Sequence, residues 1–158
     1  MDSQTIDLLR KSLDLHEGNK LQVYDDATGK PLKKGDTLQG NPTIGRGRNL
    51  ADPGISEEES DYLNTNDIIR VQQELDTKLP WWATKAPARQ LAIAELVFNL
   101  GIDKFIQKWP KTVEYLRTDQ NDKASDEIVT NRVWVEEVGT ARASYIVKLI
   151  VTGVLPQF

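Results

Sequence analysis

Two carboxylates near the N-terminus have the residue types and the spacing for acid–base chemistry. Glu17 stands at the predicted end of a first helix, and Asp26 follows nine residues later, beyond one turn and one short predicted strand. A hairpin-like return of the chain would bring the two carboxyl groups face to face. In glycoside hydrolysis one such group protonates the leaving oxygen, and the other activates water or attacks the sugar. Carboxylates at this spacing are common, so the pair predicts a site only together with its neighbours.

The predicted place of Glu17 suits an acid. The carbonyl end of a helix carries partial negative charge, which disfavours an ionised carboxylate and so favours a proton on Glu17. His16 is its neighbour, but adjacent helical side chains point about 100° apart. We therefore expect His16 to pack or cap the helix rather than to take part in catalysis.

The composition excludes several other kinds of site. The chain has no cysteine and a single histidine, so thiolate chemistry and a multi-histidine metal cage are ruled out. It contains no Gly-x-Ser-x-Gly elbow, no Gly-x-Gly-x-x-Gly and no phosphate-binding loop sequence. Chemistry must come from carboxylates, hydroxyls and the backbone, and we expect neither a cofactor nor a metal.

The charge distribution bears on the partner. The net charge of −4 argues against nucleic acid. Residues 30–48 nevertheless form a local basic segment, in which Asp36 is the only acidic residue; its cations are Lys30, Lys33, Lys34, Arg46 and Arg48. Such a segment can attract an anionic polymer, or it can be an ordinary solvated loop.

The elements that position these residues change character along the chain. Ser3 is the predicted N-cap of a first helix that has Ile6, Leu9 and Leu13 at helical spacing and ends at Gly18. Residues 20–50 alternate and carry turn glycines and prolines, which predicts a small antiparallel sheet. Ser56 and Glu59 form a capping-box pattern at the start of a long helix that Pro80 breaks.

The remainder is predicted to be helical. Helices are expected from Pro87 to near Gly101, then around residues 111–118, 122–130 and 131–137, and finally near 140–152. The fold class is therefore α+β and mainly helical. We expect a single domain over 1–158, made of an N-terminal lobe (1–55) with the short sheet, a connecting helix (56–79) and a helical C-terminal lobe (80–158).

The residues around the carboxylates carry a resemblance to a known family. The segments 16–18, 23–26 and 43–47 read His-Glu-Gly, Val-Tyr-Asp-Asp and Thr-Ile-Gly-Arg-Gly. Together they resemble the glutamate–aspartate–threonine signature of the phage lysozymes, glycoside hydrolase family 24, whose best-known members come from T-even bacteriophages. Residues 96–101, 132–134 and 142–143 resemble the family's C-terminal lobe less specifically.

The resemblance implies a role for each matched residue. Glu17 matches the general acid, and Thr43 matches a threonine that helps hold the catalytic water. Asp26, rather than Asp25, matches the second carboxylate by its nine-residue spacing from Glu17. Because adjacent strand residues face opposite sides, only one of the two aspartates is expected to point toward a cleft.

The resemblance also implies substrate contacts. Gly45 and Gly47 match glycines that let a glycan approach the backbone, although both could be simple turn glycines. Phe98 and Asn99 match cleft-lining positions, although Phe98 could belong to the core. Arg142 matches an arginine that pairs with the catalytic glutamate, one residue farther from Trp134 than in the T-even pattern. The resemblance also suggests that Arg132 contacts the peptide stem.

The clearest departure from the family is the link between the second carboxylate and the threonine. It runs 17 residues from Asp26 to Thr43, which is much longer than in the T-even lysozymes. The excess, around Lys30 to Asn41, carries much of the basic segment. We predict that this enlarged loop extends the hairpin and contacts the substrate.

The implied activity is hydrolysis, with inversion, of the β-1,4 bond between N-acetylmuramic acid and N-acetylglucosamine in bacterial peptidoglycan. Inversion would require carboxyl groups about 6.5–9.5 Å apart. One alternative is a lytic transglycosylase, which needs only the glutamate. Another is a non-catalytic wall-binding or membrane-disrupting protein that acts through residues 140–152.

The remaining expectations concern the protein's location and partners. The first residues lack the basic and apolar regions of a signal peptide, and no apolar run approaches the length of a membrane span. We therefore expect the protein to stay in the host cytoplasm, without stable membrane insertion. We also expect it to be a monomer. A holin-like membrane lesion would release it to the peptidoglycan in the periplasm, as for endolysins.

Overall fold

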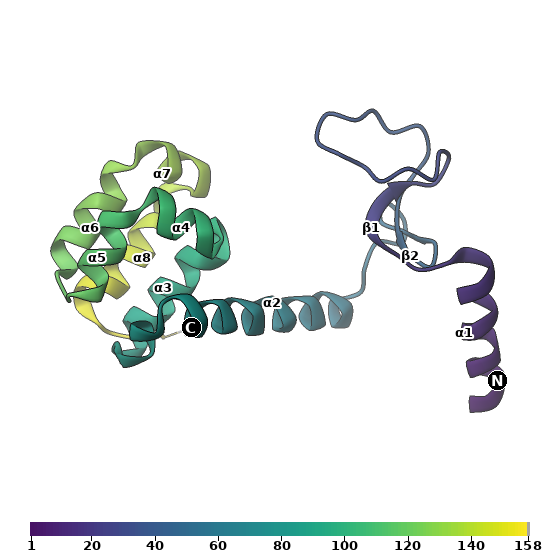
Figure 1. The fold of residues 1–158 in the computed structure, drawn as a ribbon, viewed down its shortest axis with the longest axis horizontal. Coiled ribbons are helices and arrows are strands. Elements are labelled where there is room, and N and C mark those ends of the chain that lie inside the picture. The colour runs from purple at the N-terminus through teal and green to yellow at the C-terminus, as the bar shows by residue number, and fades with distance from the viewer. Residues whose placement is uncertain (158) are drawn as a thin grey trace. The chain divides into compact units, whose positions relative to one another are not determined.

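The computed structural model describes residues 1–157, which fall into two compact units divided between Asp61 and Tyr62. It is mainly helical with one small three-stranded antiparallel sheet, which confirms the predicted α+β class (Figure 1). The N-terminal unit contains α1 (Ser3–Glu17), β1 (Lys20–Asp25), β2 (Pro42–Gly45) and β3 (Arg48–Asn49). Helix α2 (Glu57–Lys78) begins in this unit and continues into the second.

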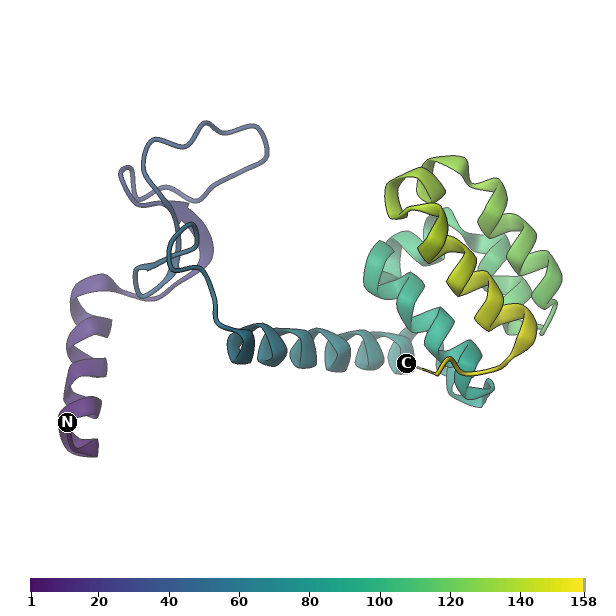
Figure 2. The ribbon, with the colours of Figure 1, turned by 180° about the vertical axis from the view of Figure 1, so that it is seen from behind.

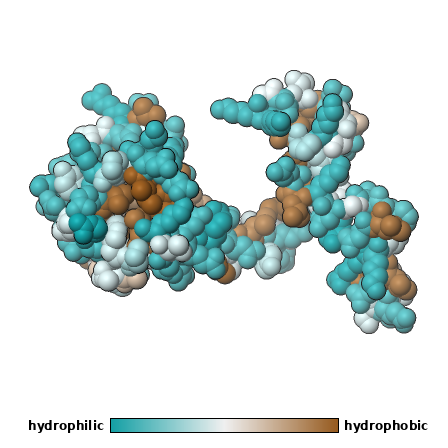
Figure 3. All heavy atoms as spheres, in the orientation of Figure 1, coloured by the Kyte–Doolittle hydropathy of each residue, from teal (hydrophilic) through white to brown (hydrophobic). Residues whose placement is uncertain are grey.

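Helix α1 begins one residue earlier than its predicted cap. The carboxylate of Asp2 accepts a hydrogen bond from the Thr5 amide at 2.7 Å, so Asp2 is the N-cap and the prediction of Ser3 was wrong. Both residue types cap well, but Ser3 already has helical geometry here. The helix ends before Gly18 as predicted. Its side chains are not buried, and its apolar residues lie at the surface (brown in Figure 3).

The sheet has the order β1-β2-β3, with both pairs antiparallel. Thr43 is the central residue of this arrangement, because it lies opposite Tyr24 of β1 and opposite Asn49 of β3. Tyr24 and Thr43 are both buried. The small antiparallel sheet predicted for residues 20–50 is confirmed.

The predicted capping box of α2 is also confirmed. The Ser56 amide donates to Glu59 Oε2 at 2.8 Å, and the Glu59 amide donates to Ser56 Oγ at 3.2 Å. Arg48 of β3 donates to both carboxylate oxygens of Glu59, at 3.1 and 2.9 Å. The Ser56 amide first and Arg48 second lower the pKa of Glu59. One carboxylate thus caps the helix and ties it to the sheet.

The C-terminal unit consists of helices. After α2 come the 3-10 helix η1 (Pro80–Thr84), α3 (Pro87–Leu100), α4 (Ile102–Lys108), α5 (Pro110–Arg117), α6 (Asn121–Thr130), α7 (Arg132–Val138) and α8 (Thr140–Thr152). The long α3 and the final α8 were predicted with nearly these bounds. The sequence analysis did not predict η1 or α4. Helix α4 is short and only Gly101 separates it from α3. The sequence analysis therefore predicted the end of a helix at Gly101 and no new helix directly after it.

A single apolar core fills this unit. Helix α3 lies against α8, and α6 lies against both α5 and α8 (Figure 2). Trp109 and Trp134 meet edge to face with ring centroids 5.2 Å apart. The largest fully buried side chains include Phe105, Ile93, Leu96, Ile128, Ile146 and Ile150. In residues 1–157 no helix is both long enough and apolar enough to cross a membrane.

Candidate active site

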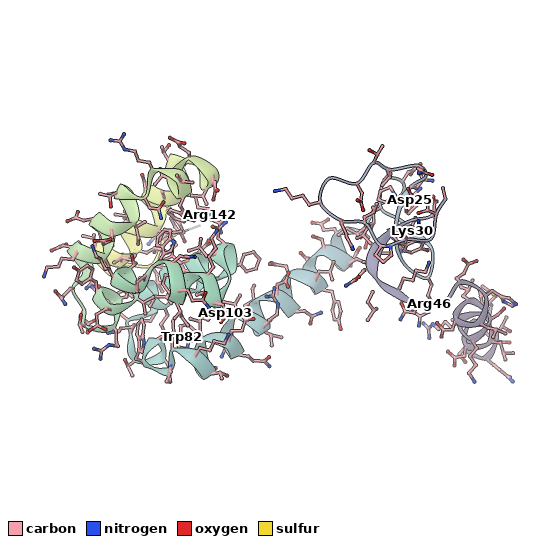
Figure 4. The ribbon with its side chains drawn as sticks, turned by 45° about the horizontal axis from the view of Figure 1, so that its top comes forward. Asp25, Lys30, Arg46, Trp82, Asp103 and Arg142 are labelled. Carbon is pink, nitrogen blue, oxygen red and sulfur yellow. The ribbon has the colours of Figure 1, made fainter. Side chains whose placement is uncertain are left out.

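Glu17 is the last residue of α1, and its carboxylate lies beside the turn that joins β2 to β3. A Cβ atom added to Gly47 would lie 3.6 Å from Glu17 Oε2, which places the carboxylate against that glycine. The turn is also tied to the helix, because Arg46 forms an ion pair with Asp14 (Figure 4). The end of α1 therefore lies next to the β2–β3 turn.

Gly45 and Gly47 give that turn its shape. Their φ values are +65° and +85°, a region that L side chains rarely adopt. A Cβ atom at Gly45 would meet no atom within 4 Å, so the backbone there faces open space. Both glycines are required by the turn itself, and the open side of Gly45 leaves room for a ligand to approach.

The two neighbouring aspartates at the end of β1 have different surroundings. Asp25 is buried, with 3% of its surface exposed. Its carboxylate accepts hydrogen bonds from the amides of Ala27, Gln39 and Gly40 at 2.9, 2.6 and 3.1 Å. Asp26 is exposed. Asp25 thus organises the backbone of the enlarged loop, and Asp26 is the carboxylate that solvent or a ligand can reach.

Asn41 holds the Asp26 carboxylate in place. Its amide donates to Asp26 Oδ1 at 2.7 Å and its side-chain nitrogen donates to Oδ2 at 3.1 Å. These two hydrogen bonds, the backbone one first, lower the pKa of Asp26 below its usual value. The close fit depends on Gly40, where a Cβ atom would overlap Asp26 Oδ1 and lie 2.8 Å from the Ala27 amide nitrogen.

Thr43 lies in β2 with 3% of its surface exposed. Its hydroxyl donates to the Asn41 carbonyl at 3.2 Å, and the Asp26 amide donates to that same carbonyl at 3.1 Å. Asn41 therefore connects the Asp26 carboxylate with the Thr43 hydroxyl. The hydroxyl oxygen can still accept a hydrogen bond, for example from a water molecule.

The enlarged loop does not extend the β1–β2 hairpin as paired strands, contrary to our prediction. It turns at residues 26–29 and runs back along the other edge of β1, where Tyr24 pairs with Pro31 and the Leu32 amide donates to the Val23 carbonyl at 2.9 Å. The Asp25 amide donates to Lys30 at 3.0 Å, while its carboxylate binds the returning part of the loop. The hydrogen bonds of Asp25 to both parts of the loop explain the difference. Figure 4 labels Asp25 and Lys30 in this region.

The basic segment is smaller than its sequence suggests. Arg46 is paired with Asp14, and Arg48 is paired with Glu59. Lys30, Lys33 and Lys34 remain exposed on the enlarged loop, without an ion pair to any described carboxylate. The positive charge available to a ligand is therefore concentrated on the loop, away from the two arginines.

His16 packs onto its own helix, since its Nδ1 lies 2.8 Å from the Ser12 carbonyl and donates to it. This contact agrees with the expected capping role. Asn41, Gly40 and Arg46 position the site and were not predicted. In the sequence Gly40, Asn41 and Pro42 indicate only a turn, and no pattern links Arg46 to Asp14.

Four predicted site residues lie in the C-terminal unit. Asn99 Oδ1 accepts from the Trp134 indole nitrogen at 2.8 Å, and Arg132 is exposed at the start of α7. Phe98 is 47% exposed and lines a groove of about 420 Å³, together with Trp82, Leu91 and Ala94. Arg142 lines the same groove and donates to Glu95 at 2.6 Å.

The structure therefore places Glu17, Asp26, Thr43, Gly45 and Gly47 in the N-terminal unit, where three of them share contacts with Asn41 or the β2–β3 turn. Among residues 1–157 no group of three or more histidine, cysteine, aspartate and glutamate side chains could hold a metal ion.

No family model matches this chain, and no curated protein matches it.

Proposed function

We propose that this protein is a lysozyme of the phage endolysin type, which hydrolyses the β-1,4 bond between N-acetylmuramic acid and N-acetylglucosamine in peptidoglycan. The observation that carries the proposal is the contrast between the two aspartates. The Asp25 carboxylate is buried and accepts hydrogen bonds from backbone amides. Asp26 is exposed, and Asn41 binds both its carboxylate and the Thr43 hydroxyl. The site that the family signature implies therefore has an accessible second carboxylate.

Asp26 has the properties of a general base. The Asn41 hydrogen bonds lower its pKa, so it is ionised at neutral pH and can take a proton from water. They also fix both of its oxygens. The water would lie between Asp26 and the Thr43 hydroxyl and would attack the anomeric carbon from the side opposite the leaving group.

Glu17 is the general acid of the proposed mechanism. As the bond between the anomeric carbon and the leaving oxygen breaks, Glu17 gives its proton to that oxygen, and Asp26 takes the proton of the attacking water. The product has the inverted configuration. The position of Glu17 beside Gly47, with open space at Gly45, supports a glycan path along the β2–β3 turn.

The substrate contacts of the C-terminal unit remain part of the proposal. Exposed Arg132 would meet the peptide stem, and Phe98 and Asn99 would line the glycan path. Arg142 donates to Glu95 of its own unit at 2.6 Å. No cofactor takes part, and the protein would reach the periplasmic face of the wall after a holin-like lesion.

The decisive experiment measures turnover on purified peptidoglycan. Glu17→Gln keeps the size of the side chain and removes the acid, so turnover should fall about 10²–10⁴-fold while the circular dichroism and melting temperature stay unchanged. Asp26→Asn should also lose activity. Glu136→Gln, an exposed glutamate of α7, is the matched control and should retain full turnover. Near wild-type turnover by the Glu17 variant would overturn the proposal.

Mass spectrometry of the products separates the chemical alternatives. Hydrolysis gives a reducing N-acetylmuramic acid end, whereas a lytic transglycosylase gives an anhydro-muramic end. A membrane-disrupting role for residues 140–152 has little support, because α8 buries Ala143, Ile146, Leu149 and Ile150 in the core. Vesicle leakage by the Glu17→Gln protein at the wild-type rate would favour that role instead.

A further inference from the structure

A second, polar pocket lies in the C-terminal unit, where α4 ends and α5 begins. Its volume is about 360 Å³, and it is lined in part by Lys108, Trp109, Lys111, Thr112, Glu127 and Asn131. We call it the α5 pocket. None of these residues belongs to the site of the proposed glycosidase activity.

Thr112 is the unusual residue of this pocket. Its side chain is 2% exposed, and its hydroxyl has no hydrogen-bond partner among residues 1–157. Other threonines in helices or directly after one donate to the carbonyl four residues earlier, as Thr77, Thr118 and Thr152 do at 2.7, 2.8 and 2.7 Å. Since α5 begins at Pro110, Thr112 lacks such a carbonyl in its own helix. Among the described residues the one fully buried polar side-chain atom without a partner is Ser125 Oγ, so the Thr112 oxygen is not sealed from solvent and a ligand in the pocket can reach it.

Two backbone amides at the start of α5 also lack an acceptor. Pro110 has no amide hydrogen, and the first helical bond at this end runs from the Val113 amide to the Trp109 carbonyl at 3.0 Å. Within the described chain the amides of Lys111 and Thr112 have no acceptor, and no side chain caps the helix. Free amides and the positive end of the helix dipole favour an anion.

The charged residues of the pocket allow an anion to enter. Lys108 has no ion pair with a described carboxylate. Lys111 Nζ lies 3.4 Å from Glu127 Oε1 and its side chain is 72% exposed, so this pair is weak. Asn131 Oδ1 accepts from the Trp134 amide at 3.2 Å, which leaves the Asn131 amide nitrogen as a further donor.

We propose that the α5 pocket binds a phosphate group through the Thr112 hydroxyl, the amides of Lys111 and Thr112, and the ammonium groups of Lys108 and Lys111. A phosphate has three or more oxygens in different directions and can use a hydroxyl, two successive amides and ammonium groups together. A carboxylate has only two oxygens in one plane. The pocket volume also accommodates a substituent on the phosphate, so either free phosphate or a phosphodiester of a polymer can occupy it.

Titration followed by ¹⁵N NMR of the full chain tests this site. The probes are sodium phosphate, glycerophosphorylglycerol as a phosphodiester, and sodium acetate, all at the same ionic strength. Phosphate should shift the Lys111 and Thr112 amides saturably. Thr112→Val keeps the shape and should weaken binding about tenfold or more, because one hydrogen bond to a charged group is lost. Glu127→Gln should tighten binding, since it removes the competing carboxylate.

Thr118→Val is the matched control, because Thr118 donates to Glu114 and does not line the pocket. It should bind phosphate as the wild type does. Binding of the phosphodiester as well would identify a polymer as a source, and binding of phosphate alone would identify free phosphate. The proposal is overturned if no saturable shift occurs, if acetate binds equally well, or if Thr112→Val binds like the wild type. It does not depend on the glycosidase activity, so the Glu17→Gln protein should show the same titration.

Discussion

The N-terminal unit and the C-terminal unit bury different kinds of side chain. In residues 1–61 the buried side chains are Tyr24, Asp25 and Thr43, two of which are polar and hydrogen-bonded. The C-terminal unit buries a large set of apolar side chains drawn from all of its α-helices. Burial of apolar area stabilises a fold without regard to direction, whereas hydrogen bonds fix particular atoms. The candidate active site lies in the unit whose geometry depends on a few directed polar contacts.

This comparison predicts that the largest loss of stability comes from the apolar core. Phe105 is fully buried, and Phe105→Ala should lower the free energy of unfolding of the C-terminal unit by about 3–5 kcal/mol through lost burial and a cavity. Denaturant unfolding followed by tryptophan fluorescence measures the change, since all four tryptophans lie in residues 81–134. Phe98→Ala, at a half-exposed phenylalanine, is the control and should cost much less.

Asp25→Ala tests whether one polar residue organises the N-terminal unit. It removes the acceptor of three amides, and we expect a local loss of about 2–3 kcal/mol, because hydrogen bonds to a charged carboxylate are lost. Hydrogen exchange of the Gln39 and Gly40 amides reports it directly. Asp36→Ala is the control, since exposed Asp36 accepts only from the Lys33 amide at 2.8 Å. If the Gln39 and Gly40 amides were equally protected from exchange in both variants, Asp25 would not organise this loop.

Gly40→Ala tests the close approach that positions Asp26. The added methyl group would overlap Asp26 Oδ1 and lie 2.8 Å from the Ala27 nitrogen, so the loop must shift at a cost of about 1–2 kcal/mol. If Asp26 acts as the base, the turnover of peptidoglycan should fall together with the stability. Gln39→Ala keeps the amide that binds Asp25 and should leave both quantities unchanged. A crystal structure of the variant with Asp26 unmoved would contradict the argument.

Ser56→Ala tests the capping box, with an expected loss of about 1 kcal/mol in thermal unfolding. Ser3→Ala is a matched control at the position that was wrongly predicted to cap α1. It should change stability by less than about 0.5 kcal/mol, because Asp2 holds that cap.

Protonation of Asp26 in acid should weaken its hydrogen bonds with Asn41, and this is the smallest expected effect. Its pKa lies below the ordinary value of 3.8, so the stabilising hydrogen bonds are present above that value and are lost as pH falls through the lower, folded-state pKa. The Asn41 amide and side-chain resonances should move together below about pH 3.8 in an NMR titration. Asn41→Ala should return the pKa of Asp26 toward its ordinary value. Movement of Asn41 alone, without Asp26, would contradict the coupling.

Local signals in the sequence determined most of the secondary structure. The Ser56 and Glu59 pattern specified the start of α2, Gly18 marked the end of α1, and apolar periodicity gave α3 and α8 nearly their observed bounds. These features depend on residues a few positions apart, so the chain itself contains the information. The same reasoning predicted the helix end at Gly101 but missed α4, because a helix of seven residues shows too little apolar periodicity.

The sequence also selected Glu17, Asp26 and Thr43 as candidates, through their types and spacing and through a family resemblance. Only the tertiary structure decided their surroundings. That Asp25 is buried and Asp26 is exposed depends on Gln39, Gly40 and Asn41, which return to β1 after a loop of more than ten residues. That the Thr112 hydroxyl has no partner depends on where α5 begins. Hydrogen bonds between distant residues require both to be placed in space, and one sequence does not specify that placement.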